Sequence, residues 1–322
     1  MSALSPSQAT PNDGTRRRGL IRAWLDSTSD PGEGNGDRVD WPRILPFVAI
    51  HFGALTALWV GVSWAAAALC VAAYAIRMFG ITAFYHRYFA HRAFRTSRLV
   101  QFLGALLGNA AGQRGPLWWA AHHRKHHKHA DTPLDLHSTE QHGFLWCHAG
   151  WWTTKRAFRT DLAQIRDLAK FPELRWLDRF DWIAPVAFAA LMFGVGATLG
   201  AVWPSLGIDG WQGLVWGFFV STVLLYHATF TINSLCHKFG SRRYATKDRS
   251  RNNAWLAVLT LGEGWHNNHH HYPVAARQGF FWWEFDPTYY GLFLLAKLGV
   301  VSELRPVPER VLDDAPGPRR AA

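Results

Sequence analysis

One apolar stretch that runs into a pair of histidines decides the fold class of this chain. Residues 42–91 are PRILPFVAIHFGALTALWVGVSWAAAALCVAAYAIRMFGITAFYHRYFAH. The chain stays apolar from Pro42 to about Tyr85, roughly twice the ~20 residues that cross a bilayer once as a helix. We therefore predict a helical hairpin with spans at about 43–62 and 65–86.

Two more apolar blocks lie further along the chain, at about 181–203 and 212–235, joined by a turn rich in Pro and Gly. The segments 87–180 and 236–305 are instead polar and basic. Trp is abundant, at 18 residues, and favours membrane–water interfaces. The sequence thus predicts an all-α integral membrane protein with four transmembrane helices and a polar helical cap.

The ends of the chain differ in composition from this folded region. Residues 1–41 and 306–322 combine Ser, Pro, Gly and charged side chains, which is typical of flexible tails. We expect one folded domain over residues 42–305.

Charge predicts the orientation. The turns near 61–64 and 204–211 contain no Lys or Arg, whereas the tails and polar segments hold nearly all of them. By the positive-inside rule, both termini and the cap face the cytoplasm. The formal charge of +11 forms no single stripe along the chain. It fits an anionic leaflet, or an anionic substrate or partner, and we expect no nucleic acid.

Seventeen histidines are far more than expected, and their spacing is informative. Three clusters and one isolated residue stand out: an HxxxxH pair at His86 and His91, an HxxHH set at His123, His126 and His127, a second HxxHH set at His266, His269 and His270, and His237. All fall on the predicted cytoplasmic side, next to the bilayer. A low-complexity metal-storage tract is the alternative, but these clusters are embedded in aromatic sequence.

The HxxHH spacing has a physical reason. Positions i, i+3 and i+4 share one face of a helix, so their imidazoles reach one metal or two adjacent metals. The HxxxxH pair would point about 140° apart on an α-helix, so we expect the helix to unwind or bend at His86. Imidazole suits Fe, Cu, Zn and Ni alike. Eight or more histidines exceed what one metal takes, which indicates two metals.

These boxes resemble, in order and spacing, the membrane fatty-acyl desaturase family, within it the acyl-CoA Δ9 branch, and a bacterial member. The resemblance covers roughly residues 42–305, and its matches are Gly80–Ala83 leading into His86, Trp119 leading into His123, the segment Gly143–Trp151, Asn233–His237, and Gly262–His270. It implies a cone-like bundle of four transmembrane helices under a cytosolic cap, in the bacterial inner membrane.

The same resemblance implies the metal ligands. Two iron ions would be held by His86, His91, His123, His126, His127, His237, His266, His269 and His270, with Asn233 approaching one iron through a water. Asp131, Asp135, His137 and Glu263 would orient the ligands from behind.

The resemblance also implies substrate contacts. Tyr74 and Met78 would line the blind end of an acyl tunnel, where a Met shortens the tunnel and favours C16 over C18 chains. Trp119 and Phe230 would lie along the tunnel, with Phe230 in place of a Trp common in animal enzymes. The basic side chains of Lys155, Arg156 and Arg124 would meet the acyl-CoA head, although ordinary cytoplasmic charge explains them equally well.

The implied reaction is O2-dependent desaturation of a C16 or C18 fatty acyl chain at Δ9. Electrons would come from a donor such as ferredoxin or cytochrome b5 with its reductase, because the chain has no flavin fingerprint and no Cys cluster for Fe–S. The alternatives are a lipid or alkane hydroxylase, or a decarboxylase, on the same scaffold, and a metal-handling membrane protein. Arg77 lies inside the second span and needs a partner that the sequence does not identify.

Overall fold

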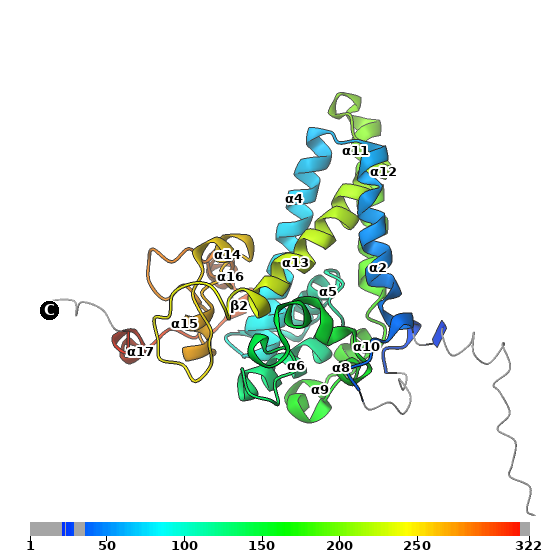
Figure 1. Ribbon diagram of the computed structural model, residues 1–322. Coiled ribbons are helices and arrows are strands. Elements are labelled where there is room, and N and C mark those ends of the chain that lie inside the picture. The colour runs from blue at the N-terminus through cyan, green and yellow to red at the C-terminus, as the bar shows by residue number, and fades with distance from the viewer. Residues whose placement is uncertain (1–20, 23, 29–35, 316–322) are drawn as a thin grey trace, which may run out of the picture.

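The computed structural model describes residues 21–22, 24–28 and 36–315. Four of its helices are long and apolar enough to cross a membrane, which confirms the four predicted spans. They are Trp41–Val60, Trp64–Ala90, Ile183–Val202 and Gly210–Ser234. In Figure 1 they stand together on one side of a broader body of short helices.

Three of the four spans are built from more than one helical segment. The first joins α2 (Trp41–Leu55) to α3 (Ala57–Val60), and the second joins α4 (Trp64–Phe79) to the π-helix η1 (Gly80–Ala90). The third is α11 (Ile183–Val202) alone. The fourth consists of α12 (Gly210–Leu214), the π-helix η6 (Val215–Val220) and α13 (Ser221–Ser234).

The broader body follows the second and fourth spans along the chain. After η1 come α5 (Arg98–Asn109), α6 (Pro116–His129), α7 (Thr139–His142), the π-helix η2 (Trp146–Gly150), the 3-10 helix η3 (Trp151–Thr153), α8 (Lys155–Phe158), the 3-10 helix η4 (Leu162–Ile165), α9 (Arg166–Ala169) and α10 (Pro172–Arg179). The 3-10 turn η5 (Pro204–Leu206) follows α11, and α14 (Ala254–Leu259), α15 (His266–His271), α16 (Pro287–Lys297) and α17 (Glu309–Asp313) follow α13.

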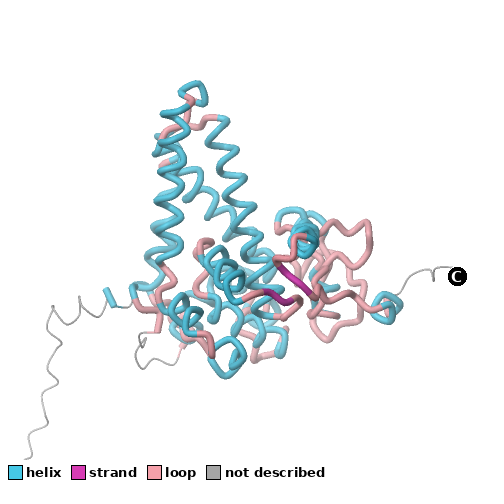
Figure 2. The backbone as a smooth tube through the Cα atoms, turned by 180° about the vertical axis from the view of Figure 1, so that it is seen from behind, coloured by secondary structure: helices cyan, strands magenta, loops and turns pink. Residues whose placement is uncertain are grey.

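Among the residues that the structure describes, one two-stranded ribbon interrupts the all-helical architecture. Strands β1 (Arg95–Thr96) and β2 (Val301–Ser302) pair antiparallel, with Arg95 opposite Ser302. Figure 2 shows this ribbon in the broader body. It ties the segment that follows η1 to the C-terminal region, so the two halves of the body are held together.

The helix α5 packs against η1. It is too short to span a bilayer and packs along η1 through its glycines. A Cβ atom at Gly104 would overlap the ring of Phe84, and one at Gly108 would overlap the ring of Tyr85. The absence of side chains at these positions lets two bulky rings of η1 lie directly against the α5 backbone.

The helix α2 is packed much more loosely than the other parts of the bundle. Ile44 is its one buried residue, whereas every residue of η1 is buried. Pro46 interrupts its hydrogen bonds and the helix breaks at Thr56 before α3. It therefore forms a wall of the bundle with few packing constraints.

The structure supplies the partners of Arg77, which is fully buried on α4. Its guanidinium donates hydrogen bonds to the hydroxyls of Thr222 (2.7 Å) and Ser221 (2.5 Å) and to the carbonyls of Ala73 and Ala110. Its charge also lies 4.5 Å from the centre of the Phe188 ring. Neutral oxygens from three elements thus replace the carboxylate that a buried arginine usually has.

The predicted tails are partly ordered. Residues 309–313 form α17, whose Val311 is buried beside Tyr244 and Phe280, so the chain after residue 306 is not loose throughout. Before α2, Asp26 pairs with Arg179 at 2.8 Å. These segments are fixed by apolar and ionic contacts that composition does not show. The predictions for residues 1–20 and 316–322 lie outside the described residues.

Candidate metal centre

Nine histidines from four segments converge where the second and fourth spans meet the broader body. One group contains His86, His91, His123, His127 and His269, and a second contains His126, His237, His266 and His270. Within each group one ring nitrogen per residue lies within 4.8 Å of the others. These are the nine residues that the resemblance implies, divided five and four.

The first pair depends on the π-helical backbone of η1. The amide of His91 donates to the carbonyl of His86 at 3.2 Å, an i to i+5 bond that defines a π-turn. Positions five apart therefore lie on one side of the helix, and the two rings are 4.9 Å apart. The helix is thus less tightly wound than an α-helix at His86, as predicted, and this π-helical winding brings the pair together.

Each HxxHH set contributes to both groups. On α6, His123 and His127 enter the five-histidine group and His126 enters the other. On α15 the pattern is reversed, because His266 and His270 enter the four-histidine group and His269 the other. The i, i+4 pair of each helix thus serves one group, and the residue at i+3 reaches across to the second.

Local contacts fix both helices that carry these sets. The amides of Leu117 and Trp118 at the start of α6 donate to the carboxylate of Asp178 from α10, at 3.0 and 2.8 Å. The amides of Asn267 and Asn268 at the start of α15 donate to the side-chain oxygen of Asn252. Both caps satisfy amides that a helix start leaves unpaired.

Carboxylates lie behind the four-histidine group. The Nδ1 atoms of His126, His237 and His270 lie 3.0, 2.9 and 2.9 Å from Asp135, Asp131 and Asp248. Although burial raises the pKa of Asp131, hydrogen bonds from His237 and its neighbours lower that pKa to about 2. The carboxylates are therefore ionised, and each accepts the Nδ1–H of its histidine, which leaves Nε2 as a bare lone pair.

This arrangement fits a bound cation. Three lone pairs of the four-histidine group point toward one another, and Nε2 of His270 is buried without a hydrogen-bond partner among the described residues. Converging lone pairs repel each other unless a positive charge lies between them. A divalent metal bound by imidazole supplies such a charge, and the carboxylate–histidine pairs are the usual support for it.

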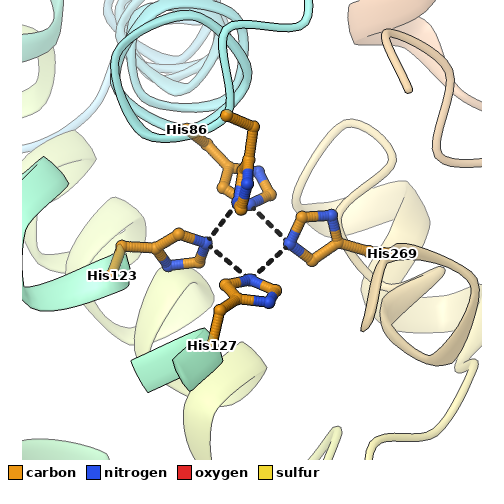
Figure 3. A group of neighbouring side chains, drawn as sticks. His86, His123, His127 and His269 are labelled. Atoms are coloured by element: carbon orange, nitrogen blue, oxygen red, sulfur yellow. Dashed lines mark hydrogen bonds between the residues drawn. The ribbon is translucent and has the colours of Figure 1, made fainter. Parts of the chain in front are cut away.

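The distances between ring nitrogens in the five-histidine group also fit a bound metal ion. The Nε2 atoms of His86, His269, His127 and His123 follow one another at 3.0, 2.8 and 3.0 Å, and Figure 3 shows the rings facing a common centre. Imidazole nitrogens ~2.1 Å from a metal and at right angles to each other are about 3.0 Å apart. Burial and the neighbouring histidines hold the pKa of His91, His123, His127 and His269 well below the usual range, so these rings are neutral.

A buried ionic network supports His86. Its Nδ1 lies 2.5 Å from Glu263, whose other oxygen accepts hydrogen bonds from the guanidinium of Arg87. Arg87 is fully buried and also pairs with Asp286 at 2.9 Å. Two carboxylates around one arginine keep this network satisfied, so the His86 ring is held in place.

A largely apolar cavity of about 560 Å³ adjoins the two groups, a size typical of small-molecule sites. Its lining includes His86, His123, His266 and Asn233, and also the apolar side chains of Met78, Ile81 and Phe218. Arg43, Arg114 and Asp181 add charged groups to the lining. A long apolar ligand could therefore pass next to both histidine groups.

The chain matches known proteins over most of its length. A family model described as "Fatty acid desaturase" matches residues 62–295. The chain belongs to the fatty acid desaturase family. It is 37% identical over 271 residues to the sn-1 stearoyl-lipid 9-desaturase of Anabaena variabilis, covering 83% of this chain and 94% of that protein.

Other relatives of this desaturase differ in the substrate that their names give. The sn-2 palmitoyl-lipid 9-desaturase of Nostoc sp. (strain 36) is 36% identical, covering 85% of this chain and 93% of that protein. The acyl-CoA C20 Delta5-desaturase of Anemone leveillei is 37% identical, covering 68% of this chain and 66% of that protein. These relatives support an oxidoreductase of lipid metabolism, which confirms the predicted family.

The structure places some of the predicted substrate residues of the desaturase in the cavity wall and others outside it. Met78, Trp119 and Phe230 line the cavity. Tyr74 does not appear among the described residues that line it, and its hydroxyl donates to the carbonyl of Leu259. Its position one turn before Met78 puts it against the α14 side of the body.

The predicted head-group cations lie outside the cavity lining, and two of them have ion-pair partners. The guanidinium of Arg124 is bound by Asp167 (2.7 Å) and by the carbonyls of Phe89 and Ala90, so it joins α6 to η1 and α9. Arg156 lies 3.6 Å from Asp37 at the surface. Neither these two nor Lys155 is among the described residues that line the cavity. Sequence alone cannot tell a free basic residue from one that already has a partner.

Several site residues had no sequence signal. Asp248 and Gln278, which contact Nδ1 of His270 and His269, come from loops with no fixed spacing to any histidine. Arg87 follows a predicted ligand directly, and this adjacency was its only signal.

Within the cavity wall, Gln113 donates to Thr229 at 2.6 Å, and Trp119 donates to Gln113 at 3.4 Å. This contact holds the Trp119 ring beside His123.

Proposed function

We propose that this protein is an O2-dependent desaturase that introduces a cis double bond, at Δ9, into a saturated C16 or C18 fatty acyl chain. One observation carries the proposal: nine histidines converge as two metal-sized groups beside an apolar cavity, and His86, His123 and His266 line it. An unactivated methylene resists acids, bases and nucleophiles, so an oxidising metal site beside an apolar cavity is the chemistry that this reaction needs.

The proposed cofactor is a pair of iron ions. His86, His91, His123, His127 and His269 would hold one, and His126, His237, His266 and His270 the other. Asn233 lines the cavity beside the second group and would reach its iron through a water. Bound iron would supply the oxidising chemistry: with O2, two external electrons and two protons, two hydrogens would leave adjacent carbons and two water molecules would form.

The protein side chains would position both the metals and the chain. Asp131, Asp135, Asp248 and Glu263 hold the Nδ1 protons and so aim Nε2 inward, while His137 lies 3.6 Å from Asp135 behind His126. Met78 and Trp119 would hold the acyl chain within the cavity, and Phe230 would lie against it. The apolar walls exclude water from the reacting carbons.

We further propose the topology expected from charge: a multi-pass protein of the bacterial inner membrane, with a cone-like four-helix bundle over residues 42–305 and a cytoplasmic cap that carries the metals. An external donor such as a ferredoxin, or cytochrome b5 with its reductase, would dock on the basic face of the cap. Lys155 and Arg156 lie on the cap, and their contact with an acyl head group stays a prediction.

The test is expression in a bacterial host that makes few unsaturated C16 and C18 chains, followed by mass spectrometry that locates double bonds. His126→Ala removes a proposed ligand, and His129→Ala is the matched control because His129 lies on the same helix outside both groups. We expect a cis-monoene with the intact chain and the control, and none with His126→Ala. A hydroxy acid or a terminal alkene would instead identify a hydroxylase or a decarboxylase.

A further inference from the structure

The cavity lies directly beneath α2, the loosely packed first span. Pro46, Phe47, Ala49 and Ile50 of α2 all line it. Since Ile44 is the one buried residue of α2, this helix covers the cavity without being fixed in the core. Its displacement would expose few buried groups, in contrast to α4 or η1.

The exposed residues of the cavity lining show where the cavity opens. Among the described residues that line the cavity, the exposed ones are Trp24, Pro46, Ala49, Trp182 and Val186. They belong to the segment before α2, to α2 itself, and to the start of α11. None of them is charged. The cavity therefore opens sideways, between α2 and α11, through an apolar rim that suits contact with lipid.

The opposite edge of α2 is closed. Three imidazoles connect it to α13 and η2: Nε2 of His51 lies 3.3 Å from Nε2 of His227, whose Nδ1 lies 3.1 Å from Nε2 of His148. Gly53 of α2 lies so close to η6 that a Cβ atom at this position would overlap the ring of Phe219. With this edge bonded and the other open, the gap between α2 and α11 is the available lateral route.

The polar end of the cavity lies at this same opening. Arg43 pairs with Asp40 at 3.0 Å, and Arg114 pairs with Asp181 at 2.9 Å. Each arginine already has a carboxylate, so this end is close to neutral. Such an end fits an uncharged ester, whereas the phosphates of CoA need unpaired cations.

We propose that the gap between α2 and α11 is the entry portal for acyl chains of membrane glycerolipids. The substrate of this desaturase would then be a lipid-bound chain, whose ester lies at Arg43 and Arg114 while the chain runs along the cavity to the histidines. Trp24 and Trp182 flank the portal and mark the level of the membrane interface, where the ester of a glycerolipid lies. This inference rests on the proposed function for its chemistry, but the portal can be tested without turnover.

Photolabelling tests the portal directly. The protein would be reconstituted in nanodiscs that contain phosphatidylglycerol with a diazirine in the middle of one acyl chain, and the labelled residues mapped by mass spectrometry. We expect labels on residues 46–50 and 182–189 and within the cavity. Ala189→Trp, which fills the cavity wall on α11, should lower cavity labelling at least tenfold. Ala190→Trp places the same side chain on the exposed face of α11, outside the cavity lining, and should change it less than twofold.

A second variant and a substrate comparison complete the test. Ala49→Trp blocks the rim from α2 and should act like Ala189→Trp, and size-exclusion profiles identify any variant that has lost its fold. Iron-loaded, chemically reduced enzyme given O2 once should convert stearoyl phosphatidylglycerol at least tenfold faster than stearoyl-CoA. Equal labelling in the two α11 variants, or preferential conversion of the CoA ester, would overturn the portal. Labelling as expected with neither substrate converted would instead count against the proposed function.

Discussion

The rings of His86 and His91 lie 4.9 Å apart although the two residues are five positions apart in sequence. An α-helix would turn them away from each other, whereas the π-helix η1 stacks them on one side. A π-helix is rare and occurs frequently at functional sites. Here α5, α6 and α16 pack against η1 and bury all of its residues.

The close contact between α5 and η1 yields the first prediction. Gly104→Ala places a methyl group into the ring of Phe84 and should destabilise the protein by about 1–3 kcal/mol, as overpacked cores do. Because Phe84 belongs to η1, bound iron per chain should fall as well. Gly194→Ala on α11 is the control, since a Cβ there meets nothing within 4 Å. Thermal unfolding in detergent and metal analysis give both readouts, and equal behaviour of the two variants would contradict the prediction.

A second prediction concerns Asp131, which holds Nδ1 of His237 at 2.9 Å. Asp131→Asn keeps the size of the side chain but removes the negative charge that fixes the His237 tautomer. We expect metal affinity or activity to fall roughly 10- to 100-fold, the usual cost of losing a carboxylate behind a ligating histidine. Glu303→Gln, on an exposed ion pair with Arg95, is the control. Unchanged iron content and unchanged product yield in Asp131→Asn would argue against a metal at the four-histidine group.

The sequence predicts the features that depend on local interactions and misses those that depend on tertiary contacts. Apolar block length predicts the four spans, and the i, i+3, i+4 spacing predicts that α6 and α15 present their histidines together. The π-turn was missed because an i, i+5 pair looks unfavourable on the default helix. Asp248 was missed because a loop residue reaches His270 only through tertiary folding. The ion pair of Arg124 was missed because its partner, Asp167, is 43 residues away.

The third prediction is a pH dependence. Burial raises the pKa of Asp178 to about 6, despite hydrogen bonds from Trp118 and Thr160 that lower it. A carboxyl whose folded pKa lies above its unfolded value, 3.8, stabilises the fold most below pH 4 and loses that contribution as pH rises through about 6. Asp178→Asn cannot ionise, and its side-chain oxygen can still accept from Leu117 and Trp118.

Asp178→Asn should therefore gain stability relative to the wild type as pH rises from about 4 to 7, by up to about 3 kcal/mol for a shift of this size. Unfolding temperatures of both proteins across this range test it, and the difference between them cancels the other titrating groups. A difference that stays constant with pH would show that Asp178 is ionised in the folded protein throughout the range.

The fourth prediction addresses chain length. Met78 is fully buried and lines the cavity, and under the proposed function its side chain would limit how far an acyl chain extends. Met78→Ala should lengthen the cavity and raise the ratio of C18 to C16 monoenes several-fold. Met192→Ala removes the same side chain from a buried position on α11 that is not among the described residues lining the cavity, which matches the loss of packing. Both variants should lose about 2–5 kcal/mol of stability. Since only Met78→Ala changes the space available to the substrate, a product ratio that moves equally in both would mean that general loosening, and not cavity length, sets the chain preference.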